Sequence, residues 1–125
     1  GAELFTYGDL GTTTTHLPYQ GEVRTADVGA LVVRTLRLDD LVQSGDLRSP
    51  RFVKIDVEGH GHRALAGMQA TLSSTRPLVM VGFHSPEEIE GMMAMLRPLN
   101  YSWREIATGL EQPDVQSGRD YLFLP

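Results

Sequence analysis

Apolar and polar positions along the chain divide it at about residue 30. Residues 1–30 are rich in Gly, Thr and Asp, and glycines and prolines interrupt them at short intervals. Such punctuation is typical of loops or of a loose hairpin. From residue 31 the pattern becomes periodic, which is typical of regular helices and strands. We therefore predict a loop-rich lead-in or hairpin over residues 1–30 and a folded segment over residues 31–125.

The periodic part predicts strands that alternate with helices. Short apolar or β-rich runs predict strands at 31–38, 51–57, 78–81, 103–106 and 121–124. A helical turn is expected at 39–42, one helix after Gly59 and another from Pro86. The apolar face of the helix after Gly59 consists of Leu65, Met68 and Leu72. This order predicts an α/β fold with a mostly parallel sheet and an antiparallel edge strand.

The clearest helix start lies at Ser85. Ser85 can cap the helix, and Pro86 suits its first position. Glu88 follows three residues after the cap, where its side chain would complete a capping box. We therefore expect the Glu88 carboxylate to turn back onto the start of its own helix.

The strand at 51–57 is anomalous because a strand covered on both faces should be apolar throughout. Here Lys54, Asp56 and Glu58 alternate with apolar residues, and a period of two places all three on one face. One lysine cannot neutralise two carboxylates, so excess negative charge lies at the carboxyl end of the strand. Ligands bind outside that end in open α/β sheets. These residues are therefore candidates for a functional site.

His84 ends the neighbouring apolar strand and should approach Asp56 across the same rim of the sheet. An imidazole there could take part in proton transfer. Two simpler interpretations stay open. The charged strand can be an edge strand with one solvated face, and His84 can be a hydrogen-bonded structural residue.

The segment Gly59–Ala64 offers an alternative, since it fits G-x-G-x-x-[GA], follows a strand and opens a helix, as a dinucleotide-binding turn does. Two features weaken this interpretation. Asp56 and Glu58 would face an anionic pyrophosphate, which has the wrong sign for them. The next strand ends in Gly82-Phe83-His84, without an acidic residue to hold a ribose hydroxyl.

A metal site is a further alternative, because Asp56, Glu58, His60 and His62 are clustered and can supply oxygen and nitrogen ligands. The turn at Gly59 separates the two pairs, and the spacing specifies no further ligand. We therefore assign no protein-only metal cage, while a divalent cation held partly by substrate stays possible.

Composition narrows the classes of partner. The chain has 125 residues, enough for one domain, with 41% hydrophobic and 22% charged residues. Eleven basic and sixteen acidic side chains give a net charge of −5, which argues against binding to nucleic acid or to an anionic membrane. The absence of cysteine excludes disulfides and thiol nucleophiles. The N-terminus has neither a secretory pattern nor an initiator methionine, so we expect a cytoplasmic protein and a processed chain or a piece of a longer one.

Four segments together resemble the FkbM family of S-adenosylmethionine-dependent methyltransferases. The resemblance runs from about residue 31 to Tyr101. Its most specific block is K-I-D-V-E-G, whose order and spacing relative to the other segments also match. The segments are Thr35–Leu41, Phe52–Gly59, Leu65–Gly67 and Arg76–Val81.

The resemblance implies a Rossmann-like class I methyltransferase fold, whose mostly parallel sheet binds S-adenosylmethionine at the carboxyl ends of its first strands. It also implies O-methylation of a small molecule or sugar-type hydroxyl. Asp56 would match the acidic residue that ends the fourth strand, beside the methyl donor and the acceptor. We assign Asp56, His84 and Lys54 as catalytic, Asp56 also as cofactor-binding, and Glu58 and His60 as substrate-binding.

Methyl transfer to an alcohol requires an acceptor for the hydroxyl proton. Asp56 or His84 could accept it directly or through a bound cation that acidifies the hydroxyl. Our hypothesis is that Asp56 orients or deprotonates the acceptor molecule, while Lys54 keeps that carboxylate ionised and fixed.

The chain also departs from the family pattern. The glycine-rich cofactor turn is not evident, so on this interpretation the chain is a C-terminal half that lacks the first three strands. Gly61 and Gly82 stand where the family often has glutamates, which removes two carboxylates from the rim. A degenerate, non-catalytic binding or structural module is therefore an alternative to the enzyme, and a dinucleotide-binding oxidoreductase fragment is a third. An unpaired sheet edge would favour self-association.

Overall fold

The computed structural model describes residues 2–7, 15–18 and 29–125, and the chain divides into two compact units, Gly1–Leu36 and Arg37–Pro125. The boundary between the units therefore falls after the one at residue 30 that the sequence predicts. Among the described residues, no helix is long and apolar enough to cross a membrane.

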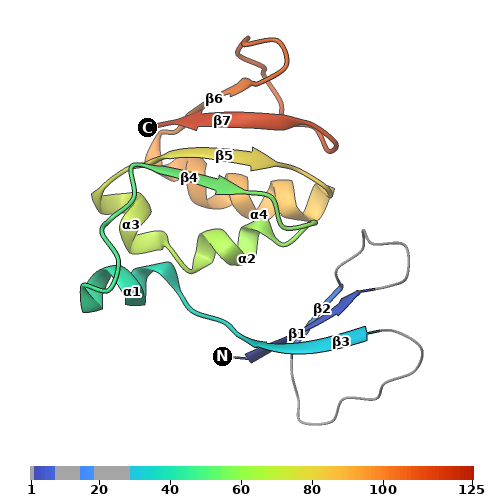
Figure 1. Ribbon diagram of the computed structural model, residues 1–125. Helices are drawn as coiled ribbons and strands as arrows, with labels where there is room; N and C mark the ends of the chain where they lie inside the picture. The colour runs from blue at the N-terminus through green and yellow to red at the C-terminus, as the bar shows by residue number, and fades with distance from the viewer. Residues whose placement is uncertain (1, 8–14, 19–28) are drawn as a thin grey trace. The chain divides into compact units, whose positions relative to one another are not determined.

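The first unit contains an antiparallel sheet of three strands in the order β2-β1-β3 (Figure 1). The strands are β1 (Ala2–Tyr7), β2 (Thr15–Pro18) and β3 (Gly29–Arg34). The sequence predicts only loops or a hairpin for residues 1–30 and assigns residues from 31 onward to the following domain. β3 lies instead in this first sheet because its backbone pairs with β1 from Ala2↔Arg34 to Tyr7↔Gly29. The predicted turns at Gly8, Gly11 and Gly21 lie outside the described residues.

The second unit contains a mixed sheet of four strands in the order β4-β5-β7-β6. β4 (Phe52–Ile55) and β5 (Leu78–Gly82) are parallel. β7 (Asp120–Leu124) is antiparallel to β5 and to β6 (Ser102–Glu105), so β4, β5 and β6 all run in one direction. The unit is therefore α/β, as predicted. Its sheet is mixed rather than mostly parallel, because only the β4–β5 pair is parallel and the β5–β7 and β7–β6 pairs are antiparallel.

The predicted antiparallel edge strand is wrong in position, because β7 lies inside the sheet between β5 and β6. Tyr121 and Phe123 of β7 are 1% and 0% exposed, and their rings pack beside Phe83. β6 carries Arg104 on the exposed side of its strand and Trp103 partly buried. The more apolar strand thus takes the interior position, where both of its edges are hydrogen-bonded, and β4 and β6 form the two margins of this sheet.

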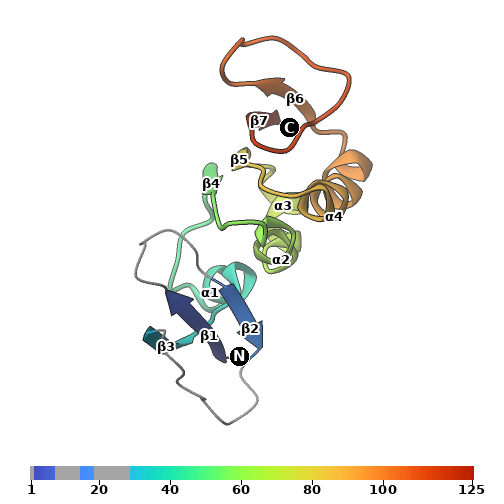
Figure 2. The ribbon, with the colours of Figure 1, turned by 90° about the vertical axis from the view of Figure 1, so that its right-hand side faces the viewer.

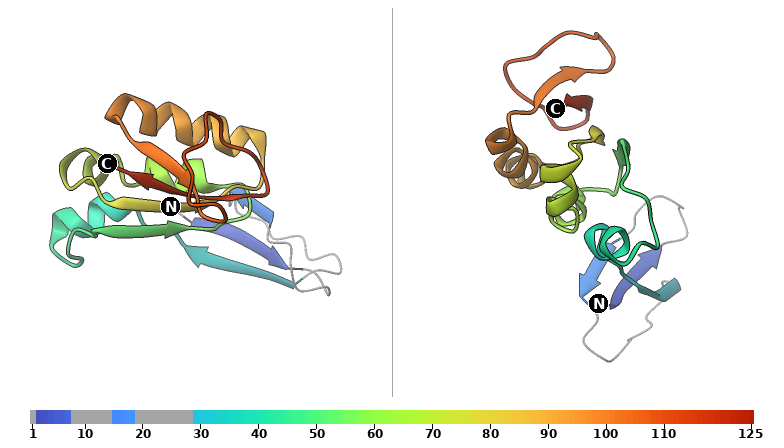
Figure 3. Two further views of the ribbon diagram at one scale, coloured as in Figure 1. Left: turned by 90° about the horizontal axis from the view of Figure 1, so that it is seen from above. Right: turned by 90° about the vertical axis from the view of Figure 1, so that its left-hand side faces the viewer.

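Helices α2 (Gly61–Ala66), α3 (Gln69–Ser74) and α4 (Pro86–Leu96) lie on the same side of this sheet (Figure 2), and α4 runs alongside the strands (Figure 3, left). A short 3₁₀ turn, Arg97–Leu99, follows α4. The core between helices and sheet is apolar, and its fully buried side chains include Leu65, Leu72, Val79, Val81, Met92, Leu96 and Phe123. The segments that follow the carboxyl ends of β4 and β5 are loops, which lead into α2 and α4.

The single helix predicted after Gly59 is divided into α2 and α3 by Gly67 and Met68. Glycine is a poor helix former, and the new helix receives a cap from a distant part of the chain. Asp39, in α1 (Leu38–Ser44), accepts hydrogen bonds from the backbone N–H of Ala70 and of Thr71, both at 2.9 Å. A carboxylate bound to the first N–H groups of a helix stabilises its start. α3 therefore begins where Asp39 meets it.

Asp39 is 4% exposed, and burial alone would raise the pKa of its carboxyl. The hydrogen bonds from Ala70 and Thr71, including one from the Thr71 hydroxyl at 2.8 Å, outweigh burial, and the charge of Arg37 adds to them. The pKa of Asp39 is therefore below its ordinary value, and the group favours the ionised state in the folded protein.

Candidate functional site

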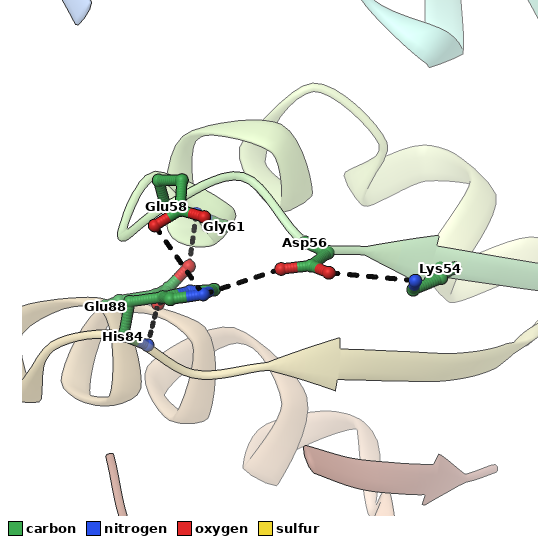
Figure 4. A network of polar contacts seen from close by, with 6 residues as sticks. All are labelled: Lys54, Asp56, Glu58, Gly61, His84 and Glu88. Carbon is green, nitrogen blue, oxygen red and sulfur yellow. Dashed lines mark hydrogen bonds and ion pairs between the residues drawn. The ribbon is translucent and has the colours of Figure 1, made fainter. Parts of the chain in front are cut away.

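The candidate site lies where β4 and β5 end. Asp56 follows β4 directly, Glu58 stands in the turn after it, and His84 follows β5. Because the two strands are parallel, their carboxyl ends meet at one edge of the sheet. Figure 4 shows the three side chains directed toward one another from these two segments. We call Asp56, Glu58 and His84 the rim.

The structure brings His84 beside Asp56, as the strand order predicts. Its Nε2 lies 3.5 Å from Asp56 Oδ1 and 3.8 Å from Glu58 Oε2. Lys54 Nζ lies 3.6 Å from the other carboxylate oxygen of Asp56, Oδ2. Asp56 therefore stands between a lysine and an imidazole, and each of its oxygens faces one of them.

The rim is open to solvent. The side chains of Lys54, Asp56 and Glu58 are 57%, 48% and 53% exposed, and that of His84 is 33% exposed. β4 also forms a margin of its sheet. The interpretation of β4 as an edge strand with a solvated face therefore holds for the second unit, and the same charged side chains nonetheless converge with His84.

Backbone conformation at the turn helps Glu58 to reach the rim. Glu58 and Gly59 both have positive φ angles, +48° and +91°. Glycine adopts this conformation readily, whereas for glutamate it is uncommon and carries a modest cost. The two residues turn the chain from β4 into α2 and direct the Glu58 carboxylate toward His84.

Glu88 lies directly beneath the rim and is 0% exposed. Its Oε1 accepts a hydrogen bond from Gly61 N–H at 2.7 Å, and its Oε2 accepts one from His84 N–H at 2.8 Å. The predicted cap at Ser85 is confirmed, since Ser85 Oγ accepts from Glu88 N–H. The predicted return of the Glu88 side chain to its own helix start is met by one oxygen, because Oε2 binds the N–H of His84, the residue before the Ser85 cap. The other oxygen binds Gly61, 27 residues away, which the capping pattern does not predict. Sequence reasoning therefore missed Glu88 as a residue of this site.

The residues that could hold a cation differ from those that the sequence clusters. In the described part of the chain, the group with suitable geometry is Asp56, Glu58 and His84, each offering one ligand atom within 4.8 Å of the others. His60 and His62 do not belong to it. His60 is half-buried at the start of α2, while His62 Nδ1 is buried without a hydrogen-bond partner. The turn at Gly59 separates the two histidines from the rim.

Comparison with known proteins identifies the relatives of this chain. The family model described as the methyltransferase FkbM domain matches residues 1–103. The chain belongs to the FkbM methyltransferase family. The match extends further toward the N-terminus than the segment from residue 31 on which the resemblance rests, and it includes the three-stranded first unit.

A curated relative of this FkbM chain is hexuronic acid methyltransferase AglP of Haloferax volcanii, which is 30% identical over 90 residues. The aligned region covers 70% of this chain and 37% of AglP, so the chain spans under half the length of that relative. No solved structure is significantly similar to the chain.

The hydrogen bonds at the start of α2 argue against the dinucleotide alternative in this FkbM chain. A pyrophosphate bound by the turn Gly59–Ala64 would need backbone N–H groups there. Glu88 Oε1 already takes the N–H of Gly61, and a buried carboxylate would repel phosphate. The geometry therefore adds a further objection to that alternative.

The two glycines that depart from the family pattern both lie against carboxylates. A Cβ on Gly61 would stand 2.6 Å from Glu88 Oε1, and a Cβ on Gly82 would stand 2.9 Å from Asp120 Oδ1 and 3.4 Å from Asp56 Oδ1. Side chains from other elements thus fill the space beside both glycines. Glu88 therefore supplies an acidic group beside Gly61, and Asp120 and Asp56 supply acidic groups beside Gly82.

Proposed function

We propose that the protein carrying this chain transfers a methyl group from S-adenosylmethionine to a hydroxyl group of a small molecule or sugar. The observation that supports this most is the pairing of Asp56 with His84 at the carboxyl ends of two parallel strands, in a chain of a methyltransferase family. S-adenosylmethionine supplies, when bound, a methyl group activated by its positive sulfur. A class I, Rossmann-like domain, with this chain as its C-terminal half, is part of the proposal.

The rim residues can handle the proton of the acceptor. As the oxygen of the hydroxyl forms a bond to the methyl carbon and the bond from that carbon to sulfur breaks, the hydroxyl proton must leave. Asp56 Oδ1 and His84 Nε2 stand 3.5 Å apart, and either can accept that proton from an oxygen that lies beside the pair within hydrogen-bond distance. Lys54 Nζ lies 3.6 Å from the second oxygen of Asp56 and is the cation that we propose orients this carboxylate.

The charge of the rim suits a cationic donor. Asp56 and Glu58 contribute two carboxylates against the single ammonium of Lys54. A positively charged sulfur is attracted to such a surface, whereas a phosphate-bearing cofactor is repelled. Asp56 is therefore the residue that we propose lies nearest the donor, and Glu58 adds negative charge beside it. A divalent cation on the same three rim residues, whose ligand atoms lie within 4.8 Å of one another, is not part of this proposal.

The relative AglP provides the first acceptor to test. Its name describes methylation of a hexuronic acid, so sugar acids are the acceptors that we propose first. Such an acceptor carries a carboxylate. Lys54, which is 57% exposed and lies beside the rim, is the cation that could bind this carboxylate. His60 remains a proposed substrate contact without a described role.

A second candidate function is a non-catalytic, methyltransferase-like binding or structural module. The exposure of the rim and the position of β4 at the margin of its sheet favour it for the chain taken alone. Within the described residues, β4 pairs with β5 alone, and its other edge can support pairing with another strand or the self-association expected from the sequence.

The experiment compares the protein with its Asp56→Asn variant, using methyl-labelled S-adenosylmethionine and both uronic acid and neutral sugar acceptors. We expect methyl transfer to a sugar acid, reduced about 100-fold or more in the variant, because a proton acceptor contributes roughly that factor. Asp114→Asn, a substitution of an exposed loop carboxylate, is the matched control and should retain activity. Equal activity of the Asp56 variant would remove this residue from the mechanism. No transfer and no binding of the donor would favour the non-catalytic module.

A further inference from the structure

Glu88 contacts the rim from its buried side through His84. Its Oε2 accepts the backbone N–H of His84 at 2.8 Å and also lies 3.8 Å from the ring atom Nδ1 of the same residue. The other ring nitrogen, Nε2, faces Asp56 and Glu58 on the exposed side (Figure 4). The imidazole therefore lies between one buried carboxylate and two solvated ones.

The two sides of the ring differ in how strongly water screens them. Glu88 is 0% exposed, while Asp56 and Glu58 are 48% and 53% exposed. At a given distance, a charge interaction is stronger where protein surrounds one of the charges than where water does. Lys54 also offsets part of the charge of Asp56. The buried carboxylate thus has the larger influence on where a neutral imidazole carries its hydrogen.

We propose that Glu88 is a positioning residue for His84, holding the neutral ring in the tautomer that carries hydrogen on Nδ1. The Nε2 lone pair then faces the rim and is free to take a proton from an acceptor hydroxyl. Once it does, the same carboxylate stabilises the positive ring. The role of this arrangement in catalysis rests on the proposed methyl transfer. The preference for the tautomer with hydrogen on Nδ1 is independent of that proposal.

Space for the Glu88 carboxylate depends on Gly61. A Cβ at this position would stand 2.6 Å from Glu88 Oε1 and 2.7 Å from Met92 Sδ, much closer than non-bonded atoms approach. Gly61 N–H also holds Oε1 in place at 2.7 Å. The absence of a side chain at Gly61 therefore leaves the space that the Glu88 carboxylate occupies.

The test is ¹⁵N NMR of the imidazole nitrogens of the whole chain, without donor or acceptor, at an alkaline pH where the rings are neutral. A His84→Gln variant assigns the His84 signals. In the unmodified protein we expect the form with hydrogen on Nδ1 to predominate, and in Glu88→Gln we expect the form with hydrogen on Nε2. Glu87→Gln, on the same helical turn but exposed, is the matched control and should leave the ratio unchanged.

Two results would overturn the proposal: hydrogen mainly on Nε2 in the unmodified protein, or the same ratio in Glu88→Gln. The first needs no substitution at Glu88, only the His84→Gln assignment, so it applies even where Glu88→Gln does not fold. If methyl transfer is established, Glu88→Gln should also lower kcat about 100-fold with little change in KM for the acceptor. An unaltered tautomer ratio speaks against the positioning role, whereas absence of methyl transfer speaks against the proposed function alone.

Discussion

Two buried carboxylates bind the starts of helices in different regions of the second unit. Asp39, on α1, accepts the N–H groups of Ala70 and Thr71 at the start of α3. Glu88, on α4, accepts the N–H of Gly61 at the start of α2. In both places a side chain from one helix satisfies backbone donors that the other helix cannot satisfy itself.

The difference lies in the remaining partners. Asp39 receives a third hydrogen bond from the Thr71 hydroxyl, so all its partners belong to α3. Glu88 receives its second hydrogen bond from His84, whose ring faces the solvent-exposed rim. Both carboxylates thus cap a helix. The Asp39 carboxylate contacts only α3, whereas the Glu88 carboxylate also connects α2 to His84 of the rim. Substitutions should separate these two roles.

The largest expected effect is on stability, in Asp39→Ala. Removal of this carboxylate leaves the buried N–H and hydroxyl of Thr71 and the partly buried N–H of Ala70 without a partner, which should lower the free energy of unfolding by about 3 kcal/mol. Urea denaturation measures the loss. The control is Asp40→Ala, which changes the exposed neighbour and should stay within about 0.5 kcal/mol. Equal stability of the two variants would mean that the cap from Asp39 does not support α3.

Gly61→Ala should have the next largest effect on the free energy of unfolding, and it should also disturb His84 in the rim. The added methyl group meets Glu88 Oε1 and Met92 Sδ within 2.7 Å, and we expect a loss of about 2 kcal/mol from overpacking. The His84 ring signals should move as well. In the control Gly67→Ala, the nearest atom to the added Cβ is at 3.4 Å, and both stability and the ring signals should change little. A shift of the His84 signals in both variants would contradict a specific link through Glu88.

Acid should weaken the Asp39 region by a smaller amount. The pKa of Asp39 is lower in the folded protein than in the unfolded chain, so the unfolded chain binds more protons as the pH falls. This contribution to stability is complete above about pH 4, the ordinary range for an aspartate, and is lost as the pH falls through the folded pKa. Denaturation curves at neutral pH and at about pH 3 should therefore differ more for the unmodified protein than for Asp39→Asn. Identical pH dependence of the two would contradict this assignment.

The smallest effect is expected for Lys54→Met. The ion pair of Lys54 with Asp56 is 3.6 Å long and lies between side chains that are 57% and 48% exposed, so water screens it. We expect a change of less than about 0.5 kcal/mol in the free energy of unfolding. Arg51→Met, at an exposed position just before β4, is the control for loss of one positive charge. A loss above about 1 kcal/mol in Lys54→Met alone would show that the ion pair beside the rim stabilises the fold. The rim would then resemble the Asp39 region in its effect on stability.

Local patterns predict the rim well because two short-range rules define it. Alternation along β4 places Lys54 and Asp56 on one face, and the end of the neighbouring parallel strand brings His84 to Asp56. The role of Glu88 could not be predicted in this way. Its sequence context satisfies the capping-box pattern, yet its partner Gly61 lies 27 residues away, and only the packing of α2 against α4 brings the two together.

Strand order within the sheet shows the same limit. The apolar character of β7 predicts a strand at 121–124, and the structure has one there. Its place between β5 and β6 depends on which side chains fill the core best. Tyr121 and Phe123 fill it more completely than the side chains of β6, and this competition between distant segments leaves no periodic signal in the sequence.

The interior position of β7 has a consequence for the order of folding. In the described part of the chain, β6 hydrogen-bonds to the sheet only through β7, so β6 can join it only together with that strand. β7 must in turn pair with β5, from which α4 and β6 separate it in the chain, and such non-local pairings form slowly. Until then the edge of β5 beside Val79 and Val81 is open to incorrect partners. A displacement of β7 by one residue would turn Tyr121 and Phe123 away from the core, so the final insertion also selects the correct register.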